Sequence, residues 1–219
     1  MSRPLPLAGI RVLDLTRLLP GPVATLHIAD LGADVVKIED PEVGDYARTL
    51  GTGTGEDSAY FRMINRNKRG LRLDLKQPAG VEVFLRLAER ADVVVESFRP
   101  GVVDRLGIGY DALRPLNERL TYGSITGFGP TGPYADRPAY DPIAQGLVGM
   151  MHIQGKPFGG KPQLIQSAIV DKTTATAAAG AALAALYARD RPGGTGKGQR
   201  VDVPMIDAWA ANCLPDMMP

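Results

Sequence analysis

Short runs of branched apolar residues alternate along the chain with longer segments whose apolar positions recur at helical spacing. Residues 10–15 (IRVLDL) predict a strand, and residues 21–31 predict a helix with Pro22 in its first turn, where the missing N–H of proline removes no hydrogen bond. Gly32 ends that helix, and residues 34–39 (DVVKIE) predict a second strand. Strand, helix and strand at this spacing predict a βαβ unit with parallel pairing and a right-handed crossover.

The same alternation continues to the end of the chain. Residues 78–91 predict a helix with its apolar positions on one face, and residues 92–98 (DVVVESF) are almost continuously apolar, which is typical of a strand covered on both sides. The remaining predicted elements are strands at 70–75, 120–126 and 199–203, short helices near 101–106 and 111–118, a segment at 141–152, and a long helix after Asp171. This order predicts an α/β fold with an open, doubly wound, Rossmann-like parallel sheet, forming one domain over residues 1–219.

Composition adds the broad class of protein. The 219 residues are enough for one core, and 44% hydrophobic residues, 22% charged residues and a net charge of +1 are typical of a soluble protein. Near neutrality gives no electrostatic reason to expect a nucleic acid or a membrane surface as partner. The first residues lack the apolar region of a secretory signal, and residues 173–187 are too short and too weakly hydrophobic for a membrane span. We therefore expect a cytoplasmic protein.

Cysteine and histidine are scarce. Cys213 is the one cysteine and cannot form a disulfide within the chain, which fits a reducing compartment. His27 and His152 lie far apart in the sequence and have no cysteine companions, so no metal site is expected.

Two glycine-rich segments resemble nucleotide-binding motifs. Residues 127–132 (GFGPTG) match G-x-G-x-x-G after a strand, but Pro130 and Pro133 remove backbone donors where a pyrophosphate would bind. Residues 193–198 (GGTGKG) lack the spacing of a P-loop and have no Ser or Thr after the lysine. We predict a turn-rich loop and a surface turn, respectively.

Asp171 lies near the start of the long, alanine-rich helix in SAIVDKTTATAAAGAALAALYARD. One interpretation is a helix cap, because an aspartate there accepts backbone N–H bonds and favours the positive end of the helix dipole, together contributing about 1 kcal/mol. The other is a catalytic carboxylate. The two roles are compatible, and we expect the helix N-terminus to keep the carboxylate ionised.

Eight segments in a fixed order cover nearly the whole chain: LAGIRVLDLTRLLPGP, LGADVVKIE, NRNKRGLRLDLK, DVVVESFRPGVVDRLG, SITGFGPTGPY, YDPIAQG, the Asp171 segment and TGKGQRVDV. No single segment is decisive, but the ordered set is specific. It resembles the class III coenzyme A transferases (CaiB/BaiF type), the family that includes formyl-CoA transferase, carnitine CoA-transferase and α-methylacyl-CoA racemase.

The resemblance implies that Asp171 is the catalytic aspartate. In the transferases of this family the carboxylate attacks an acyl-CoA thioester, forms an acyl-aspartyl anhydride and then an aspartyl-CoA thioester, and a carboxylic acid accepts the CoA. Covalent catalysis of this kind divides one difficult exchange into easier steps. The implied substrates are an acyl-CoA and an acceptor acid, with coenzyme A as the group carried and no metal.

The resemblance also implies a CoA site, built by basic groups and an apolar slot at the carboxyl ends of the strands. The residues that match family positions near pantetheine, adenine and phosphates are Arg17, Leu18, Leu73, Lys76, Phe98 and Arg105. Asp40 departs from the family pattern, because some relatives place an arginine just after this strand. Arg137 is a hypothetical substitute for that phosphate contact. For Lys76 and Arg105, solvated surface charges are the alternative interpretation.

Tyr140 bears on the choice between two reactions. The racemases of the family carry a histidine in this region, whereas RPAYDPIAQG presents Tyr140 and Asp141. A tyrosine with a pKa near 10 is a poor base at neutral pH, so the departure favours CoA transfer. A racemase built from Asp171 and His152 stays open as an alternative. Tyr140 either shapes the thioester pocket or packs in the core.

The resemblance further implies that relatives are roughly twice as long, with a second, smaller domain that supplies a glycine-rich loop over the catalytic aspartate. We therefore expect a truncated or split family member lacking the C-terminal half of the family fold. An exposed sheet edge and bare apolar helices predict a homo-oligomer, such as the interlocked dimer of the family, or a complex with a chain that supplies the missing half. The remaining alternative is a non-catalytic, CoA-binding subunit.

Overall fold

The computed structural model describes residues 4–51 and 57–217. At its centre lies a six-stranded sheet in the order β3-β2-β1-β4-β5-β6, in which every neighbouring pair is parallel. The strands are β1 (Arg11–Asp14), β2 (Asp34–Glu39), β3 (Lys68–Arg72), β4 (Val93–Glu96), β5 (Thr121–Thr126) and β6 (Arg200–Pro204). The chain winds outward from β1 in one direction and from β4 in the other, which confirms the predicted doubly wound sheet and places its switch point between β1 and β4.

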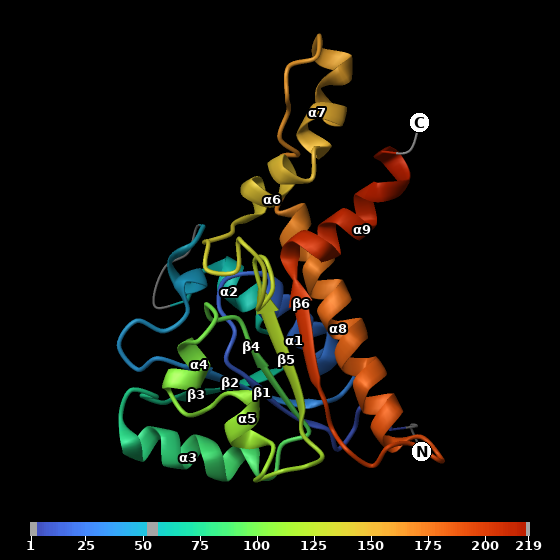
Figure 1. Cartoon of the computed structure of the whole chain (residues 1–219). Helices are drawn as coiled ribbons and strands as arrows, with labels where there is room; N and C mark the ends of the chain where they lie inside the picture. Colours follow the sequence, from blue (N-terminus) through green and yellow to red (C-terminus); the bar gives the residue numbers. More distant parts are fainter. Residues whose placement is uncertain (1–3, 52–56, 218–219) are drawn as a thin grey trace.

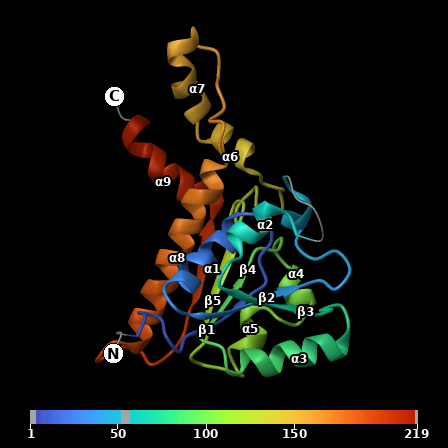
Figure 2. The ribbon, with the colours of Figure 1, turned by 180° about the vertical axis from the view of Figure 1, so that it is seen from behind.

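Helices cover both faces of the sheet (Figure 1). They are α1 (Pro20–Asp30), η1 (Tyr46–Thr49), α2 (Ala59–Ile64), α3 (Pro78–Ala88), α4 (Val102–Arg105), α5 (Tyr110–Leu113), α6 (Asp141–Leu147), α7 (Met150–Gly155), η2 (Lys156–Phe158), α8 (Ile169–Asp190) and α9 (Met205–Met217). Helices α1 and α8 lie side by side on one face, and α3, α4 and α5 lie on the other, as the reverse view in Figure 2 also shows. Helices α6 and α7 extend beyond the carboxyl ends of the strands.

Alternation along the central strands divides the core into two layers. On the α1 and α8 side, Val12, Val35 and Val93 are buried against the small side chains of α8, which include Ala175, Ala178, Ala179 and Ala182. On the other side, Leu13, Ile38 and Val94 are buried with Phe84 of α3. The alanine seam lets the long helix lie close to α1 and the sheet, so the apolar stretch of α8 belongs to the core.

The third strand differs from its predicted position. The structure places β3 at Lys68–Arg72, paired with β2 from Val35↔Lys68 to Glu39↔Arg72, whereas the sequence predicted residues 70–75. This edge strand is polar and largely exposed, so its ends carry no apolar signal. The prediction was shifted because Leu73 and Leu75 are apolar. In the structure these two residues follow the strand and pack against the α3-side core.

Two helical segments between β2 and β3, η1 and α2, were not predicted from the sequence. Ser58 begins α2 by accepting a hydrogen bond from the backbone N–H of Phe61 at 3.0 Å. The predicted segment 141–152 divides into α6 and α7 at Gly149, whose φ of +88° favours glycine. The two glycine-rich segments form turns, as predicted, and do not open helices of their own.

Two helical glycines predict opposite stability effects. A Cβ at Gly80 in α3 would lie 1.9 Å from the backbone oxygen of Asp74, whereas a Cβ at Gly180 in α8 meets no atom within 4 Å. We expect Gly80→Ala to lower the free energy of unfolding by about 1–3 kcal/mol and Gly180→Ala to raise it by about 0.5–1 kcal/mol. Urea denaturation of both variants measures these changes, and a stabilised Gly80→Ala variant would contradict the packing described.

Candidate functional site

A cavity of about 440 Å³ lies at the carboxyl ends of the strands, beside the switch point of the sheet. The loops after β1, β4 and β5 contribute to its wall, together with the start of α8. Six of the nine residues predicted for the site line it: Arg17, Leu18, Phe98, Arg137, Tyr140 and Asp171. Arg17 and Asp171, which are 154 positions apart in the chain (171 − 17), therefore line the same cavity.

The other three predicted residues lie outside the wall of this cavity. Leu73 follows β3, and its backbone N–H donates to the carbonyl oxygen of Glu39 at 2.8 Å. Lys76 is exposed and forms an ion pair with Asp40 at 3.1 Å. Asp40 is the residue that departs from the family pattern, so this departure supplies the partner of Lys76. Arg105 ends α4 and is exposed.

The start of α8 is capped by a residue from another helix. Asp141, the first residue of α6, is buried, and its Oδ2 accepts hydrogen bonds from the backbone N–H groups of Val170 at 2.7 Å and Asp171 at 3.2 Å. The residue at the N-cap position, Ala168, has no side chain that could do this. The interpretation of Asp171 as the cap is therefore wrong, because Asp141 already occupies the amide groups that a cap would use.

The carboxylate of Asp171 consequently takes no part in capping its own helix. Within residues 4–51 and 57–217, no hydrogen bond or ion pair to its side chain is present, and the side chain is partly buried in the cavity wall. Burial, followed by the negative charge of Asp141, raises the pKa of Asp171 to about 7, against a smaller lowering by Lys172. The expectation that the helix N-terminus keeps this group ionised is thus wrong. An ionised Asp171 at this position is poorly solvated and unbonded, which favours attack on a carbon electrophile.

Arg17 presents a positive charge to the cavity. Its guanidinium lies 5.3 Å from the centre of the Phe98 ring and 5.6 Å from that of Tyr46, distances at which cation–π attraction operates. Its backbone N–H donates to the hydroxyl of Ser97 at 3.1 Å. The loop after β1 is thereby joined to the turn after β4 through both its backbone and its side chain.

Leu18 adopts an unusual backbone conformation at the edge of the cavity. Its φ is +65°, in the left-handed region that leucine rarely occupies. Its backbone N–H donates to Oδ1 of Asp45 at 3.0 Å. Sequence reasoning missed Asp45 and Tyr46, because they lie at the N-cap and the first position of η1, a short helix with no apolar periodicity.

Tyr60 is a further neighbour of the site that the sequence did not indicate. It lies on α2, and burial followed by the negative charges of Asp171 and Asp45 raises its pKa. Tyr140 lines the cavity and is 61% exposed, so the core-packing interpretation of this residue is wrong. His152 is exposed on α7 and does not line the cavity, which gives no support to its pairing with Asp171.

A smaller cavity of about 180 Å³ lies on the other side of the turn that carries Phe98. Glu96 is buried there, and its Oε2 accepts the backbone N–H of Phe98 at 2.7 Å. Burial raises the pKa of Glu96 to about 7. The hydroxyl of Tyr122 also lines this space and has no partner in the described part of the chain. The hydrogen bond between Glu96 and the Phe98 N–H therefore fixes the turn that carries Phe98, from the side opposite the Asp171 cavity.

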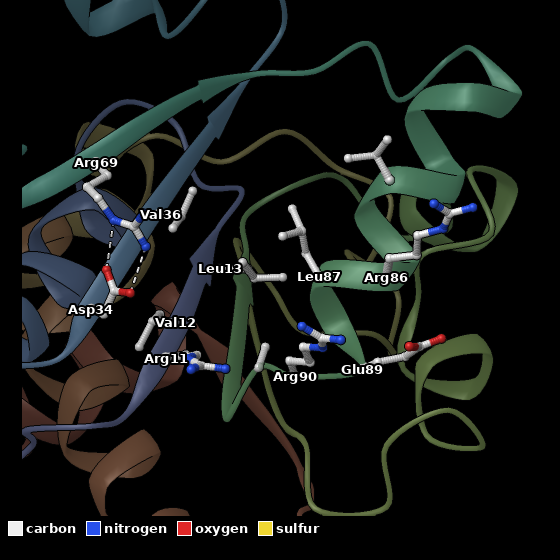
Figure 3. A pocket seen from close by; sticks show the side chains of 12 residues that line it. Arg11, Val12, Leu13, Asp34, Val36, Arg69, Arg86, Leu87, Glu89 and Arg90 are labelled. Carbon is white, nitrogen blue, oxygen red and sulfur yellow. Dashed lines mark hydrogen bonds and ion pairs between the residues drawn. The ribbon is translucent and has the colours of Figure 1, made fainter.

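A third cavity, of about 890 Å³, lies near the amino ends of β1 and β2, between these strands and α3 (Figure 3). Leu13 and Leu87 point toward each other across it, and Arg11 and Arg90 lie at its rim. None of the nine predicted site residues lines it. In doubly wound sheets, ligands bind at the carboxyl ends of the strands, so the cavity that contains Asp171 is the better candidate for a functional site.

Comparison with known proteins shows the family of this chain. The family model described as CoA-transferase family III matches residues 7–219. The chain belongs to CoA-transferase family III. It is similar to the acetyl-CoA:oxalate CoA-transferase of Acetobacter aceti, with 43% identity over 206 residues, which are 94% of this chain and 52% of the relative.

Two further relatives of this family III chain are informative. The human succinyl-CoA:glutarate CoA-transferase is 40% identical over 210 residues, covering 95% of this chain and 47% of the relative. The crystal structure of a CAIB/BAIF family protein from Brucella suis matches with a TM-score of 0.90 and 40% identity, covering 97% of this chain and 56% of that one. The chain thus spans about half the length of the curated relatives it matches.

None of the helices within residues 4–51 and 57–217 has the length and apolar character needed to cross a membrane. In the same part of the chain, no three His, Cys, Asp or Glu side chains are grouped so that they could hold a metal ion. The expectation of a metal-free site remains a prediction.

The shifted pKa of Asp171 predicts how stability depends on pH. Its pKa is raised from 3.8 to about 7 in the folded state, so ionisation destabilises the fold as the pH rises from about 4 to 7. We expect Asp171→Asn to raise the free energy of unfolding by about 1–3 kcal/mol at pH 8 and to have little effect at pH 4. Urea denaturation at several pH values measures this.

Asp14 supplies a comparison of opposite sign. Burial acts to raise its pKa, but the charges of Lys68 and Lys37 and hydrogen bonds from two threonines lower it from 3.8 to about 2. Its ionised form therefore stabilises the fold above about pH 4, and this contribution is lost as the pH falls toward 2. We expect Asp14→Asn to destabilise the protein at pH 8, and equal effects of the two substitutions would contradict the environments described.

Proposed function

We propose that the protein transfers coenzyme A from an acyl-CoA to a carboxylic acid, with Asp171 as the nucleophile. The observation that carries the proposal is the free carboxylate of Asp171 in the cavity at the switch point, with its helix amides held by Asp141. Membership of CoA-transferase family III supports the reaction type. Arg17, Phe98 and Tyr140 supply the charge, the apolar surface and the hydroxyl expected in such a pocket.

The chemistry begins when the ionised Asp171 oxygen attacks the thioester carbon of the donor. The C–S bond breaks, CoA leaves as a thiolate, and an acyl-aspartyl anhydride forms. The thiolate attacks the aspartyl carbon of the anhydride, which releases the donor carboxylate and leaves an aspartyl-CoA thioester. The acceptor carboxylate attacks that thioester, releases the thiolate and forms a second anhydride, whose acceptor carbon is then attacked by the thiolate. Asp171 is regenerated as a carboxylate.

Each of these steps depends on the protonation and hydration of the cavity. With a pKa of about 7, Asp171 is increasingly ionised, and therefore nucleophilic, as the pH rises through neutrality. An anhydride would be hydrolysed by water, so the reaction needs a covered site. The partly buried position of Asp171 in the cavity wall supplies one side of that cover.

We further propose that the pantetheine arm of CoA enters the cavity beside Leu18 and Phe98. The adenine and phosphate end then extends past the cavity, where Leu73, Lys76 and Arg105 lie at the carboxyl side of the sheet, with Arg137 at the cavity wall. Arginine and lysine groups suit the pyrophosphate and the 3′-phosphate. Lys76 would have to exchange its ion pair with Asp40 for a phosphate.

The acceptor is proposed to be a short dicarboxylic acid. Relatives of this chain are named for oxalate, glutarate and mesaconate. Arg17 and Arg137 both line the cavity and offer two cationic groups, so one carboxylate can bind while the other attacks. Because the chain spans about half the length of these relatives, we propose that a second copy or another polypeptide completes the wall over Asp171.

Acyl-CoA racemisation is the second candidate, since the family resemblance includes racemases. It requires a base on each face of the α-carbon. The cavity presents Tyr140 where a histidine would be needed, and His152 lies elsewhere on α7. A CoA-binding subunit without activity of its own is the third.

Trapping of the covalent intermediate distinguishes the three. The protein is incubated with acetyl-CoA and succinyl-CoA, treated with hydroxylamine, digested and analysed by mass spectrometry. We expect a hydroxamate at Asp171, formed at a rate that rises with pH and is half-maximal near pH 7. The Asp171→Ala variant gives none, and Asp207→Ala, an exposed acid in the first turn of α9, serves as the matched control and leaves the yield unchanged.

Deuterium uptake at the α-carbon of a 2-methylacyl-CoA without any adduct would favour racemisation. Binding of CoA with neither result would identify a binding subunit. A hydroxamate that persists in the Asp171→Ala variant would contradict the assignment of the nucleophile.

Arg17 provides a separate test of the CoA site. Removing its charge while keeping its length, in Arg17→Met, is expected to weaken CoA binding by about tenfold or more, because the loop after β1 loses its contact with the rings of Phe98 and Tyr46 and its attraction for the anionic ligand. Lys197→Met is the control, since Lys197 is exposed and pairs with Glu118 near the amino end of β6. Isothermal titration calorimetry measures both, and equal affinities would contradict the placement of CoA.

A further inference from the structure

An ion pair is buried directly beneath the loop that carries Arg17 into the cavity. Lys37, from β2, and Asp45, which precedes η1, lie 2.8 Å apart, and their side chains are 2% and 0% exposed. A buried charge is costly unless its partner and its hydrogen bonds are all in place. Movement of the surrounding backbone would leave a buried charge without its partners, so the pair restrains that backbone.

Both members of the pair also bond the backbone of the loop, on either side of Arg17. Lys37 Nζ donates to the carbonyl oxygen of Thr16 at 2.8 Å. Oδ1 of Asp45 accepts from the N–H of Leu18 at 3.0 Å and from that of Ala47 at 2.9 Å. The carbonyl before Arg17 and the amide after it are thus tied to one ion pair.

This arrangement accounts for the conformation of Leu18. A leucine with a φ of +65° is strained and persists where its surroundings enforce that angle. The hydrogen bond from its N–H to the charged Asp45 provides such a restraint, since bonds to an ionised acceptor are stronger than those between neutral groups. The turn at Leu18 directs the chain from Arg17 into α1.

A second buried pair fixes the other end of the loop. Asp14, at the end of β1, lies 3.0 Å from Lys68 of β3, and Oδ1 of Asp14 accepts from the N–H of Thr16 at 2.9 Å. The loop is consequently anchored to ionic groups from three neighbouring strands, β1, β2 and β3.

We propose that the Lys37–Asp45 ion pair is a positioning element for CoA binding: it holds the backbone on both sides of Arg17, so that the guanidinium lies between Phe98 and Tyr46 at the mouth of the cavity. The proposal rests on the proposed CoA-transferase function for its consequence, but the restraint on the loop is independent of any ligand. Neither Lys37 nor Asp45 lines the cavity, so both act through Arg17 and Leu18.

A matched pair elsewhere in the molecule allows the positioning role to be separated from stability. Arg189 of α8 is 1% exposed and forms an ion pair with Asp92 at 2.9 Å. It also donates to the carbonyl oxygen of Arg119 at 2.8 Å, near the amino ends of β4 and β5. Loss of this buried cation removes its ion pairs with Asp92 and Asp190, whose side chains are 25% and 39% exposed, and leaves the contacts of the loop after β1 unchanged.

The test compares Lys37→Met with Arg189→Met in the full chain. Amide hydrogen exchange of Leu18 is measured relative to that of Val95 in the central strand β4, and CoA affinity is measured per folded molecule. Both variants lose stability. In Lys37→Met we expect the relative exchange of Leu18 to rise by about tenfold or more and the CoA affinity to fall by about tenfold, whereas both stay within about twofold of the parent in Arg189→Met.

A second variant keeps the test decisive if Lys37→Met does not fold. The double substitution Lys37→Met with Asp45→Asn leaves no unpaired buried charge and keeps an amide oxygen opposite Leu18, so it is better tolerated. We expect it to show the same two changes to a smaller extent. Unchanged Leu18 exchange in a folded variant of the pair would overturn the proposal.

The two readouts also separate this proposal from the proposed function. If the parent protein does not bind CoA, the proposed function fails, and the exchange of Leu18 still decides whether the pair positions the loop. Increased exchange with unaltered CoA affinity would show that the loop is held by the pair but that its position does not matter for CoA, which overturns the positioning role.

Discussion

The candidate site depends on one interaction between helices, in which the carboxylate of Asp141 accepts the backbone N–H groups of Val170 and Asp171. The first amides of a helix need acceptors, and an aspartate near the helix start usually provides one itself. Because Asp141 from α6 fills that role, Asp171 keeps its own oxygens unbonded in the cavity. The same neighbour carries a negative charge that, after burial, raises the pKa of Asp171. Asp141 thus leaves the proposed nucleophile unbonded and adds to the effect of burial on its pKa.

The opposite wall of the cavity is organised in a related way, with charges buried behind the surface that would meet a substrate. Lys37 and Asp45 hold the loop that presents Arg17, and Glu96 holds the turn that presents Phe98. Parallel strands place these loops at one edge of the sheet, and buried polar groups then fix their conformations, since no regular secondary structure does so. Arg17, Leu18 and Phe98, which would touch CoA, are partly buried in the cavity wall, while Lys37, Asp45 and Glu96, which position them, are fully enclosed.

Much of this could be predicted from the sequence, and the exceptions have physical reasons. The strand at 34–39 was predicted with its observed bounds because Val35, Val36 and Ile38 lie in a short run that directly follows the helix-ending Gly32. The polar edge strand β3 carries no such apolar run, and its predicted position was shifted toward Leu73. Motif resemblance brought Arg17 and Asp171 to one site before the fold was known. The role of Asp141 could not be predicted in this way, because a cap supplied from 30 residues away is a tertiary contact without a local pattern. A helix cap therefore stood as one of two interpretations of Asp171.

Titration of the Asp171 carboxyl by carbon-13 NMR tests most directly whether this group is free and poorly solvated. We expect a pKa of about 7 in the parent protein and a lower value in Asp141→Asn, where the neighbouring negative charge is absent while an amide oxygen can still cap the helix. A pKa at or below the ordinary value of 3.8 in the parent would show that the carboxylate is hydrogen-bonded or well hydrated. Such a result would contradict the assignment of Asp171 as an unoccupied nucleophile.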